Sequence, residues 1–333
     1  MNLLVTGGAG YVGSHVVAAL VRDGRRVLVV DDLSNGHAEA LPGAVELERA
    51  DVTASGILPQ LAAKFGARAI LHFAARIQVG ESVARPDLYY ATNVGGMLRV
   101  IEAASAGRLP VVFSSTAAVY GEPDVTPIPV EHPCRPQNPY GRSKWIGEQM
   151  LADAGRAARF GWAALRYFNA AGAEPGLFER HHPETHLIPL AIAAARGSGA
   201  ALELYGDDWP TPDGTCVRDY VHVADLADAH LRALDLLLGG ASAPAADSRA
   251  PAADERAPAH LVNLGAGRGV TVREVLAAVE RAVGRPVPHR VAPRRPGDVA
   301  ALVADVTRAR DVLGWQPRRS SIDEIVVDAV RSS

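Results

Sequence analysis

Two side chains four residues apart, the phenol of Tyr140 and the ammonium group of Lys144, have types and spacing that suit acid–base chemistry. On a helix, positions i and i+4 share one face, so the two groups would lie close together. A free phenol has a pKa of about 10 and is a poor base at neutral pH. A neighbouring cation stabilises the phenolate and lowers this pKa, which would make Tyr140 a general base. Such pairs are common by chance, so the assignment needs support from other residues.

Thr116 provides part of this support. It follows a short apolar run, residues 110–114, within the stretch SSTAAVYG at 114–121. In a doubly wound sheet, ligands bind beyond the carboxyl ends of the strands. Thr116 would therefore stand in the ligand cleft, where its hydroxyl could bridge a substrate oxygen and the Tyr140 phenol. The plainer interpretation is that a Thr after a strand only caps the next turn.

A glycine-rich turn, GGAGYVG at residues 7–13, resembles a phosphate-binding loop. Gly7, Gly10 and Gly13 would let the backbone turn tightly, approach a pyrophosphate and pack a helix against a strand. About 20 residues later, a second apolar run ends at Asp31, where a carboxylate can bind a ribose 2′-hydroxyl and would repel a 2′-phosphate. The pattern favours NAD over NADP. Asp31 could instead cap a helix, and Asp32 is a second candidate for the ribose.

The elements that would position these residues follow from the hydrophobic pattern of the first half of the chain. Near-continuous apolar strands separated by amphipathic helices are typical of a parallel sheet covered on both faces. The sequence therefore predicts an α/β fold, a doubly wound parallel sheet of the Rossmann type. Strands are expected at 3–6, 27–31, 69–73, 110–114 and 162–167, and helices near 11–23, 54–65, 88–106 and 140–158.

The second half has a looser pattern, with loops richer in Pro and Gly. Helices are expected near 187–196, 224–238, 271–283 and 321–331, and a strand at 261–264. We therefore predict an NAD-binding Rossmann domain, 1–170, to which some later segments return, and a smaller mixed lobe for the substrate, 171–333. Residues 239–260 are almost wholly Ala, Pro, Ser, Gly and charged, so an exposed loop is expected there.

Composition narrows the function classes. A net charge of -3 without a long basic run offers no electrostatic footprint for nucleic acid or an anionic membrane. No apolar stretch approaches the roughly 20 residues that span a bilayer, and the N-terminus lacks the features of a signal peptide. Cys134 and Cys216 are far apart and lack metal-type spacing, so we expect reduced thiols and a cytoplasmic protein.

Taken together, these motifs resemble the extended short-chain dehydrogenase/reductase superfamily and, within it, the UDP-glucose 4-epimerase family. The superfamily resemblance rests on the glycine-rich turn, the SSTxxVYG stretch and the YxxxK pair. The epimerase resemblance adds, in order along the chain, HFAA (72–75), VGES (79–82), LRYFN (165–169), GTCVRDYVHV (214–223), NLG (263–265) and PRRPGD (293–298). It covers nearly the whole chain except 239–260, which looks like an insertion.

The resemblance implies an isomerase that interconverts UDP-glucose and UDP-galactose, with a tightly bound NAD regenerated in each cycle. It implies catalytic roles for Thr116, Tyr140 and Lys144. It implies cofactor contacts at Gly7, Gly10, Tyr11, Val12, Gly13, Asp31, Asp32, Asn35, Asp51, Val52, Phe73, Ala74, Ala75, Asn93, Tyr140, Lys144 and Phe168. It implies UDP-sugar contacts at Thr116, Asn169, His186, Leu187, Tyr205, Arg218, Arg295 and Asp298. It also implies a homodimer formed by the helices near 88–106 and 140–158.

Several alternatives stay open from the sequence. Leu302 falls where relatives limit the space around the sugar, so N-acetylated and pentose substrates remain possible. Asp298 could form a surface ion pair with Arg295 instead of binding a ribose. A nucleotide-sugar dehydratase is disfavoured because Ala117 and Ala118 stand where that chemistry needs an acid and a base. A non-catalytic NAD-binding protein is the other alternative. His181, His182 and His186 are expected to lie in a surface loop without a metal.

Overall fold

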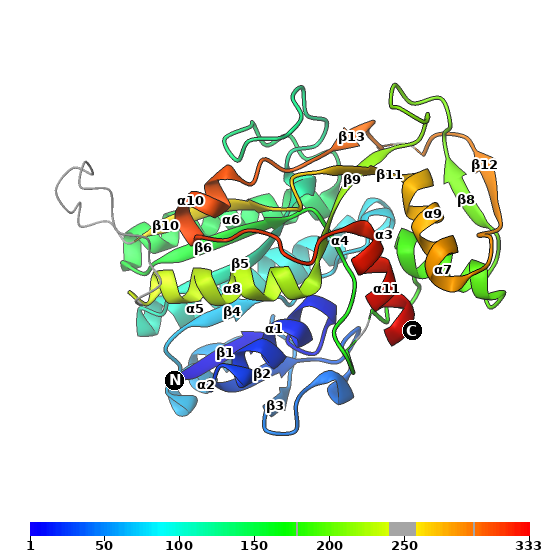
Figure 1. Ribbon diagram of the computed structural model, residues 1–333. Helices are drawn as coiled ribbons and strands as arrows, with labels where there is room; N and C mark the ends of the chain where they lie inside the picture. Colours follow the sequence, from blue (N-terminus) through cyan, green and yellow to red (C-terminus); the bar gives the residue numbers. More distant parts are fainter. Residues whose placement is uncertain (178, 240–257, 296) are drawn as a thin grey trace.

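The computed structural model describes residues 1–177, 179–239, 258–295 and 297–333. Its largest layer is a parallel sheet with the strand order β10-β6-β5-β4-β1-β2-β3 (Figure 1). The strands are β1 (Asn2–Thr6), β2 (Arg26–Asp31), β3 (Glu46–Arg49), β4 (Ile70–His72), β5 (Val111–Thr116), β6 (Trp162–Tyr167) and β10 (Ala259–Leu264). The direction of progress along the sheet reverses between β1 and β4, which is where a doubly wound sheet opens its ligand crevice.

Alternate residues of each strand build separate cores on the two faces of this sheet. Leu3 and Val5 of β1 pack on one face with α1 (Tyr11–Arg22), α8 (Val223–Leu237) and α10 (Thr307–Leu313). Leu4 packs on the other face with α2 (Ile57–Phe65), α5 (Gly95–Gly107) and α6 (Pro139–Ala158). Because both faces are covered, the strands read as continuous apolar runs and not as alternating patterns.

A smaller lobe lies beyond the carboxyl ends of the strands, on the right in Figure 1. One small sheet joins β7 (Asn169–Ala171), β9 (Val217–His222), β11 (Gly269–Thr271) and β13 (Ala301–Leu302), and a second pairs β8 (Leu202–Tyr205) with β12 (His289–Ala292). The helices α7 (Leu187–Arg196), α9 (Val272–Val283) and α11 (Ile322–Ser332) share one core with these strands. The remaining short turns are α3 (Val79–Ala84), α4 (Pro86–Tyr89), a π-helical turn (Tyr90–Val94) and 3-10 turns at Ala38–Ala40 and Ala117–Val119.

The predicted doubly wound sheet with a smaller lobe is confirmed, with differences in detail. The strand expected at 261–264 is β10, which pairs with β6 in the large sheet. The helix expected from 88 is divided into α4, a π-helical turn and α5. The helix expected from 54 begins only at Ile57, because Gly56 adopts a left-handed conformation with φ +76°. The strand β3 and the short strands of the smaller lobe were not predicted.

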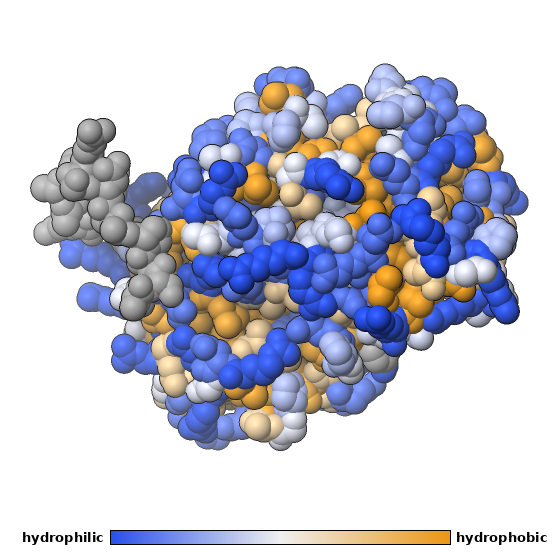
Figure 2. Space-filling model, in the orientation of Figure 1, coloured by the Kyte–Doolittle hydropathy of each residue, from blue (hydrophilic) through white to orange (hydrophobic). Residues whose placement is uncertain are grey.

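The surface in the view of Figure 2 is mainly hydrophilic, with hydrophobic residues showing in smaller groups. In the described part of the chain, no helix is long and apolar enough to cross a membrane. Most of the loop expected at 239–260 lies outside the described residues.

Candidate active site

The turn between β1 and α1 has no room for side chains at two of its glycines. Gly7 has φ +70°, and a Cβ there would lie 2.3 Å from the backbone nitrogen of Ala74. A Cβ on Gly13 would lie 2.2 Å from the carbonyl oxygen of Gly7. Gly10 is the N-cap of α1, so no side chain caps the first-turn N–H groups of this helix. An uncapped helix start behind a tight glycine turn fits a pyrophosphate group.

The structure distinguishes the two aspartates that follow β2. Asp31 is buried, and its carboxylate accepts hydrogen bonds from the backbone N–H groups of Ala9, at 3.0 Å, and Leu33, at 2.9 Å. Burial raises the pKa of Asp31, and these two hydrogen bonds partly oppose the rise. Asp32 is exposed and accepts only from the N–H of Ser34 among the described residues. Asp31 is therefore the carboxylate that lies against the glycine turn.

The other predicted cofactor residues follow the carboxyl ends of neighbouring strands. After β3, Asp51 is exposed and Val52 is buried against Gly96. After β4, the N–H groups of Phe73 and Ala74 donate to the carbonyl of Thr6, and Ala75 continues this loop. The buried Asn93 bonds the backbone of Arg76 in the same loop and the hydroxyl of Ser143 on α6. After β6, Phe168 is buried.

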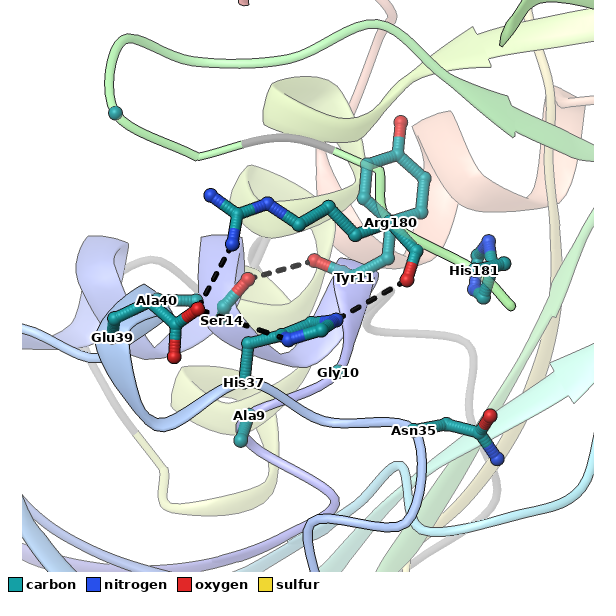
Figure 3. A pocket seen from close by; sticks show the side chains of 11 residues that line it. Ala9, Gly10, Tyr11, Ser14, Asn35, His37, Glu39, Ala40, Arg180 and His181 are labelled. Atoms are coloured by element: carbon teal, nitrogen blue, oxygen red, sulfur yellow. Dashed lines mark hydrogen bonds and ion pairs between the residues drawn. The ribbon is translucent and has the colours of Figure 1, made fainter. Parts of the chain in front are cut away.

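A pocket opens over the glycine turn, closed on one side by residues from the smaller lobe (Figure 3). The Arg180 guanidinium lies 2.9 Å from Glu39, and the backbone carbonyl oxygen of Arg180 lies 3.2 Å from Nε2 of His37. The Tyr11 hydroxyl donates to the carbonyl oxygen of Gly172. The residues that line the pocket are Ala9, Gly10, Tyr11, Ser14, Asn35, His37, Glu39, Ala40, Gly176, Arg180 and His181. The predicted cofactor contacts Gly10, Tyr11 and Asn35 therefore line the same pocket.

Thr116 and Tyr140 meet where β5 and α6 approach each other. Thr116 ends β5, and its hydroxyl accepts from the N–H of Ala118, so it does cap the next turn. The same hydroxyl faces the Tyr140 phenol closely enough to lower the pKa of that phenol. A Cβ on Gly141 would lie 2.5 Å from the carbonyl oxygen of Ala118, so this close approach requires a glycine next to the tyrosine.

Lys144 lies one helical turn beyond Tyr140 and is almost fully buried. Its Nζ donates to the carbonyl oxygen of Ser114 at 2.8 Å and lies 5.0 Å from the centre of the Phe113 ring. Burial lowers the pKa of Lys144 to about 7, against the opposing charge of Glu148. Burial also raises the pKa of Tyr140, and the Thr116 hydroxyl opposes this rise. In the protein alone, the pKa of Tyr140 is therefore shifted upward, opposite to the direction expected from a neighbouring Lys144.

A buried polar network that the sequence analysis missed lies beneath these residues. Glu148 accepts two hydrogen bonds from Arg166, at 2.9 and 2.6 Å, and one from Ser115 at 2.5 Å. Arg166 also donates to the hydroxyl of Tyr120, which donates to Asn263 on β10. The signal that could have identified Glu148 is its position four residues after Lys144, on the face that already carries Tyr140.

Four of the predicted substrate residues gather in the smaller lobe. Asp298 lies 3.0 Å from Arg295 and 3.6 Å from Arg218, so the ion pair considered as its alternative role is present. The Arg295 guanidinium lies 5.3 Å from the centre of the Tyr205 ring, which is 37% exposed. Arg218 on β9 is also the register partner of Leu302 on β13.

Three other predicted substrate residues lie on different elements. Asn169 begins β7, and His186 is the N-cap of α7 directly before Leu187. His186 also lies with His181 in a cluster with two glutamates, whereas His182 is exposed outside it.

Comparison with known proteins places this arrangement in a family. Residues 3–242 match the model of the NAD dependent epimerase/dehydratase family. The chain belongs to this family. A UDP-glucose 4-epimerase from Rhizobium meliloti (strain 1021) is 48% identical over 320 residues, which are 95% of this chain and 92% of that protein.

Solved structures of family members have the same fold. UDP-glucose 4-epimerase from Brucella ovis in complex with NAD has a TM-score of 0.91 and 42% identity, covering 99% of this chain and 97% of that one. The UDP-Glc/GlcNAc 4-epimerase from Campylobacter jejuni has a TM-score of 0.83 and 34% identity, with 99% and 98% covered. The predicted resemblance to UDP-glucose 4-epimerases is thus confirmed. The expectation of NAD as cofactor agrees with this family and with the open start of α1.

Proposed function

We propose that this family member is a UDP-glucose 4-epimerase, an isomerase that interconverts UDP-glucose and UDP-galactose. The observation that carries the proposal is the Tyr140 phenol, which lies one helical turn from the buried Lys144 and whose pKa the nearby Thr116 hydroxyl lowers. These groups stand at the carboxyl end of β5, beside the crevice of the doubly wound sheet. The names of the similar proteins support the same activity.

In the proposed reaction, Tyr140 as a phenolate accepts the proton of the sugar 4-hydroxyl, and Thr116 orients that hydroxyl. NAD, held by the predicted cofactor residues around the glycine turn, would supply reversible hydride transfer at C4 of the sugar. Because burial raises the pKa of Tyr140, the phenolate needs nearby positive charge, and the Lys144 ammonium is the chain's own source. After the 4-keto sugar has rotated to present its opposite face, Tyr140 returns the proton to O4 of the product.

The UDP group must stay bound while the sugar rotates, and we assign this role to Arg218 and Arg295. Both guanidinium groups lie on the smaller lobe within 4 Å of Asp298. A planar guanidinium suits a diphosphate better than an ammonium group does. Asp298 would exchange one of its arginine contacts for a ribose hydroxyl when UDP binds. Asn169, His186, Leu187 and Tyr205 complete the proposed substrate contacts.

A dehydratase, the other activity in the family name, needs an acid and a base beside the tyrosine. The positions after Thr116 are Ala117, which is buried, and Ala118, which packs against Gly141. Neither can transfer a proton. The acceptable sugars depend on Leu302, whose strand pairs with that of Arg218. Leucine is smaller than an aromatic side chain, so UDP-N-acetylglucosamine and UDP-pentoses are alternative substrates of the same site.

We also propose that two copies associate through α5 and α6, which lie side by side on one face of the sheet. Leu98 on α5 is 41% exposed and would be covered in such a dimer. The two cysteines, Cys134 and Cys216, are unpaired thiols, which is in keeping with the proposed cytoplasmic location.

The test is to incubate the purified protein with UDP-galactose and, separately, UDP-N-acetylgalactosamine, without added NAD, and to follow 4-epimer formation by NMR. We expect turnover of UDP-galactose, and turnover of both sugars if Leu302 leaves room for the N-acetyl group. The variant Tyr140→Phe should lose about 10²–10⁴-fold in kcat, the range for a general acid–base group. Asp153→Asn, at an exposed position of the same helix, is the control. Absence of turnover with NAD and UDP-pentoses supplied would overturn the proposal.

A further inference from the structure

Four metal-binding side chains meet on one short segment between the two lobes. The segment carries the spacing Glu-x-His twice, at Glu179 and His181 and again at Glu184 and His186. One ligand atom from each of the four side chains lies within 4.8 Å of the other three. Of the four, only His186 is among the proposed substrate contacts, and the other three have no role in the proposed epimerase reaction.

The distances inside the cluster are short and nearly all run between a carboxylate and an imidazole. Nδ1 of His181 lies 3.0 Å from Glu179, and Nδ1 of His186 lies 2.9 Å from Glu179 and 2.8 Å from Glu184. Glu184 is also held by the backbone N–H groups of Thr185 and His186, at 2.7 and 2.8 Å. The side chains of Glu179 and His181 are only 10% and 12% exposed.

The two carboxylates pair with histidines and not with more strongly basic side chains. Among the described residues, Glu179 and Glu184 form ion pairs only with the two histidines, and no lysine or arginine pairs with either. Two carboxylates largely withdrawn from water therefore favour an additional cation at their centre.

We propose that Glu179, His181, Glu184 and His186 bind a divalent transition-metal ion, for which zinc is the best fit. Zinc takes four ligands at about 2.0–2.2 Å, with imidazole nitrogen and carboxylate oxygen among its preferred donors. Such ligand atoms lie roughly 3.3–3.5 Å apart, so the cluster needs only small side-chain movements to reach this geometry. The two imidazoles disfavour calcium and magnesium, which prefer oxygen ligands throughout.

The bound ion would stiffen the segment that closes the cofactor pocket. Arg180 lies between the proposed ligands Glu179 and His181 in the sequence. It contacts both Glu39 and His37 across the pocket (Figure 3). The ring of His181 lies 6.0 Å from that of Tyr11, edge to face, at the start of α1. His186 begins α7. One ion would thus fix the pocket wall and the start of α7 together, and its removal should speed the loss of bound NAD.

Metal binding can be measured without substrate, so its outcome is independent of the proposed epimerase activity. The full-length protein, free of any affinity tag, is treated with a chelator, passed over a desalting column and titrated with zinc chloride. We expect one equivalent of zinc per chain by mass spectrometry of the bound metal. Cobalt(II) should give the visible absorption of a four-coordinate site, and zinc should displace it. These two measurements need only the wild-type chain.

Variants locate the site. His181→Asn and Glu179→Gln should weaken zinc binding at least tenfold, whereas His182→Asn, an exposed histidine in the same segment, should leave it unchanged. Circular dichroism shows which variants are folded. Failure of the wild-type chain to hold zinc or to give the cobalt spectrum would overturn the proposal. Equal zinc affinity in His181→Asn and His182→Asn would also overturn it, because the ion would then lie elsewhere.

Discussion

The buried pair of Glu148 and Arg166 permits a quantitative prediction for the variant Glu148→Gln. The side chains are only 2% and 4% exposed, and three hydrogen bonds converge on the carboxylate. Burial opposes the charge of Arg166, but Glu148 outweighs burial and raises the pKa of Arg166, so the guanidinium stays charged. Removal of one partner of a buried ion pair leaves an uncompensated charge and costs about 3–5 kcal/mol. With a urea dependence of about 3 kcal/mol per M, the unfolding midpoint should fall by about 1–1.7 M.

Urea unfolding followed by circular dichroism measures this shift, and two further variants control it. Asp153→Asn removes an exposed pair with Arg156 on the same helix and should change the midpoint little, because exposed pairs contribute about 0–1 kcal/mol. The double variant Glu148→Gln/Arg166→Met removes the stranded charge and should recover part of the loss. The reasoning is refuted if Glu148→Gln unfolds at the same urea concentration as Asp153→Asn.

Two other predictions concern the glycine turn and the buried lysine. Gly7→Ala should reduce the NAD that copurifies with the protein more than tenfold, because its Cβ would meet the backbone at Ala74. Gly24→Ala, with a similar φ of +72° and open space, should retain NAD; equal retention in both would contradict the steric argument. The pKa of Lys144 is about 7 in the folded chain and 10.5 in the unfolded chain, so the unfolded chain binds more protons between these values. Relative to Lys144→Met, the wild type should therefore gain about 2 kcal/mol of unfolding free energy between pH 7.5 and 9, and parallel urea–pH profiles would contradict this.

The large sheet could be predicted because its strands are buried on both faces and therefore appear as apolar runs. The strand from Trp162 to Tyr167 was predicted with the bounds that the structure shows. The place of β10 could not be predicted, since the pattern of a strand does not reveal its neighbours. The short strands β7, β11 and β13 have two or three residues each, too few for a periodic signal. Their existence depends on pairing with β9.

In the candidate site, too, the sequence predicts residues that act through local contacts and misses those that depend on contacts distant in the chain. The spacing of Tyr140 and Lys144, and the glycines at 7 and 13, act through contacts within a few residues or across one turn, so the sequence indicates them. The spacing of Glu148 from Lys144 indicates only a shared helix face, and an acidic residue on a helix usually faces water. Its burial depends on Arg166, which comes from a strand that the local pattern does not reveal. The glutamates at 179 and 184 were missed for the related reason that a loop has no periodicity.

The network beneath the active site explains why several of the recognised motifs include residues that do not face the crevice. Ser115 and Tyr120 come from one motif, Arg166 from a second and Asn263 from a third, and they are joined by hydrogen bonds in the interior. A buried polar network is stable only when all its members are satisfied, so it fixes the relative positions of β5, β6 and β10. Thr116 directly follows Ser115. Its hydroxyl therefore reaches the Tyr140 phenol from a backbone that residues far along the chain hold in place.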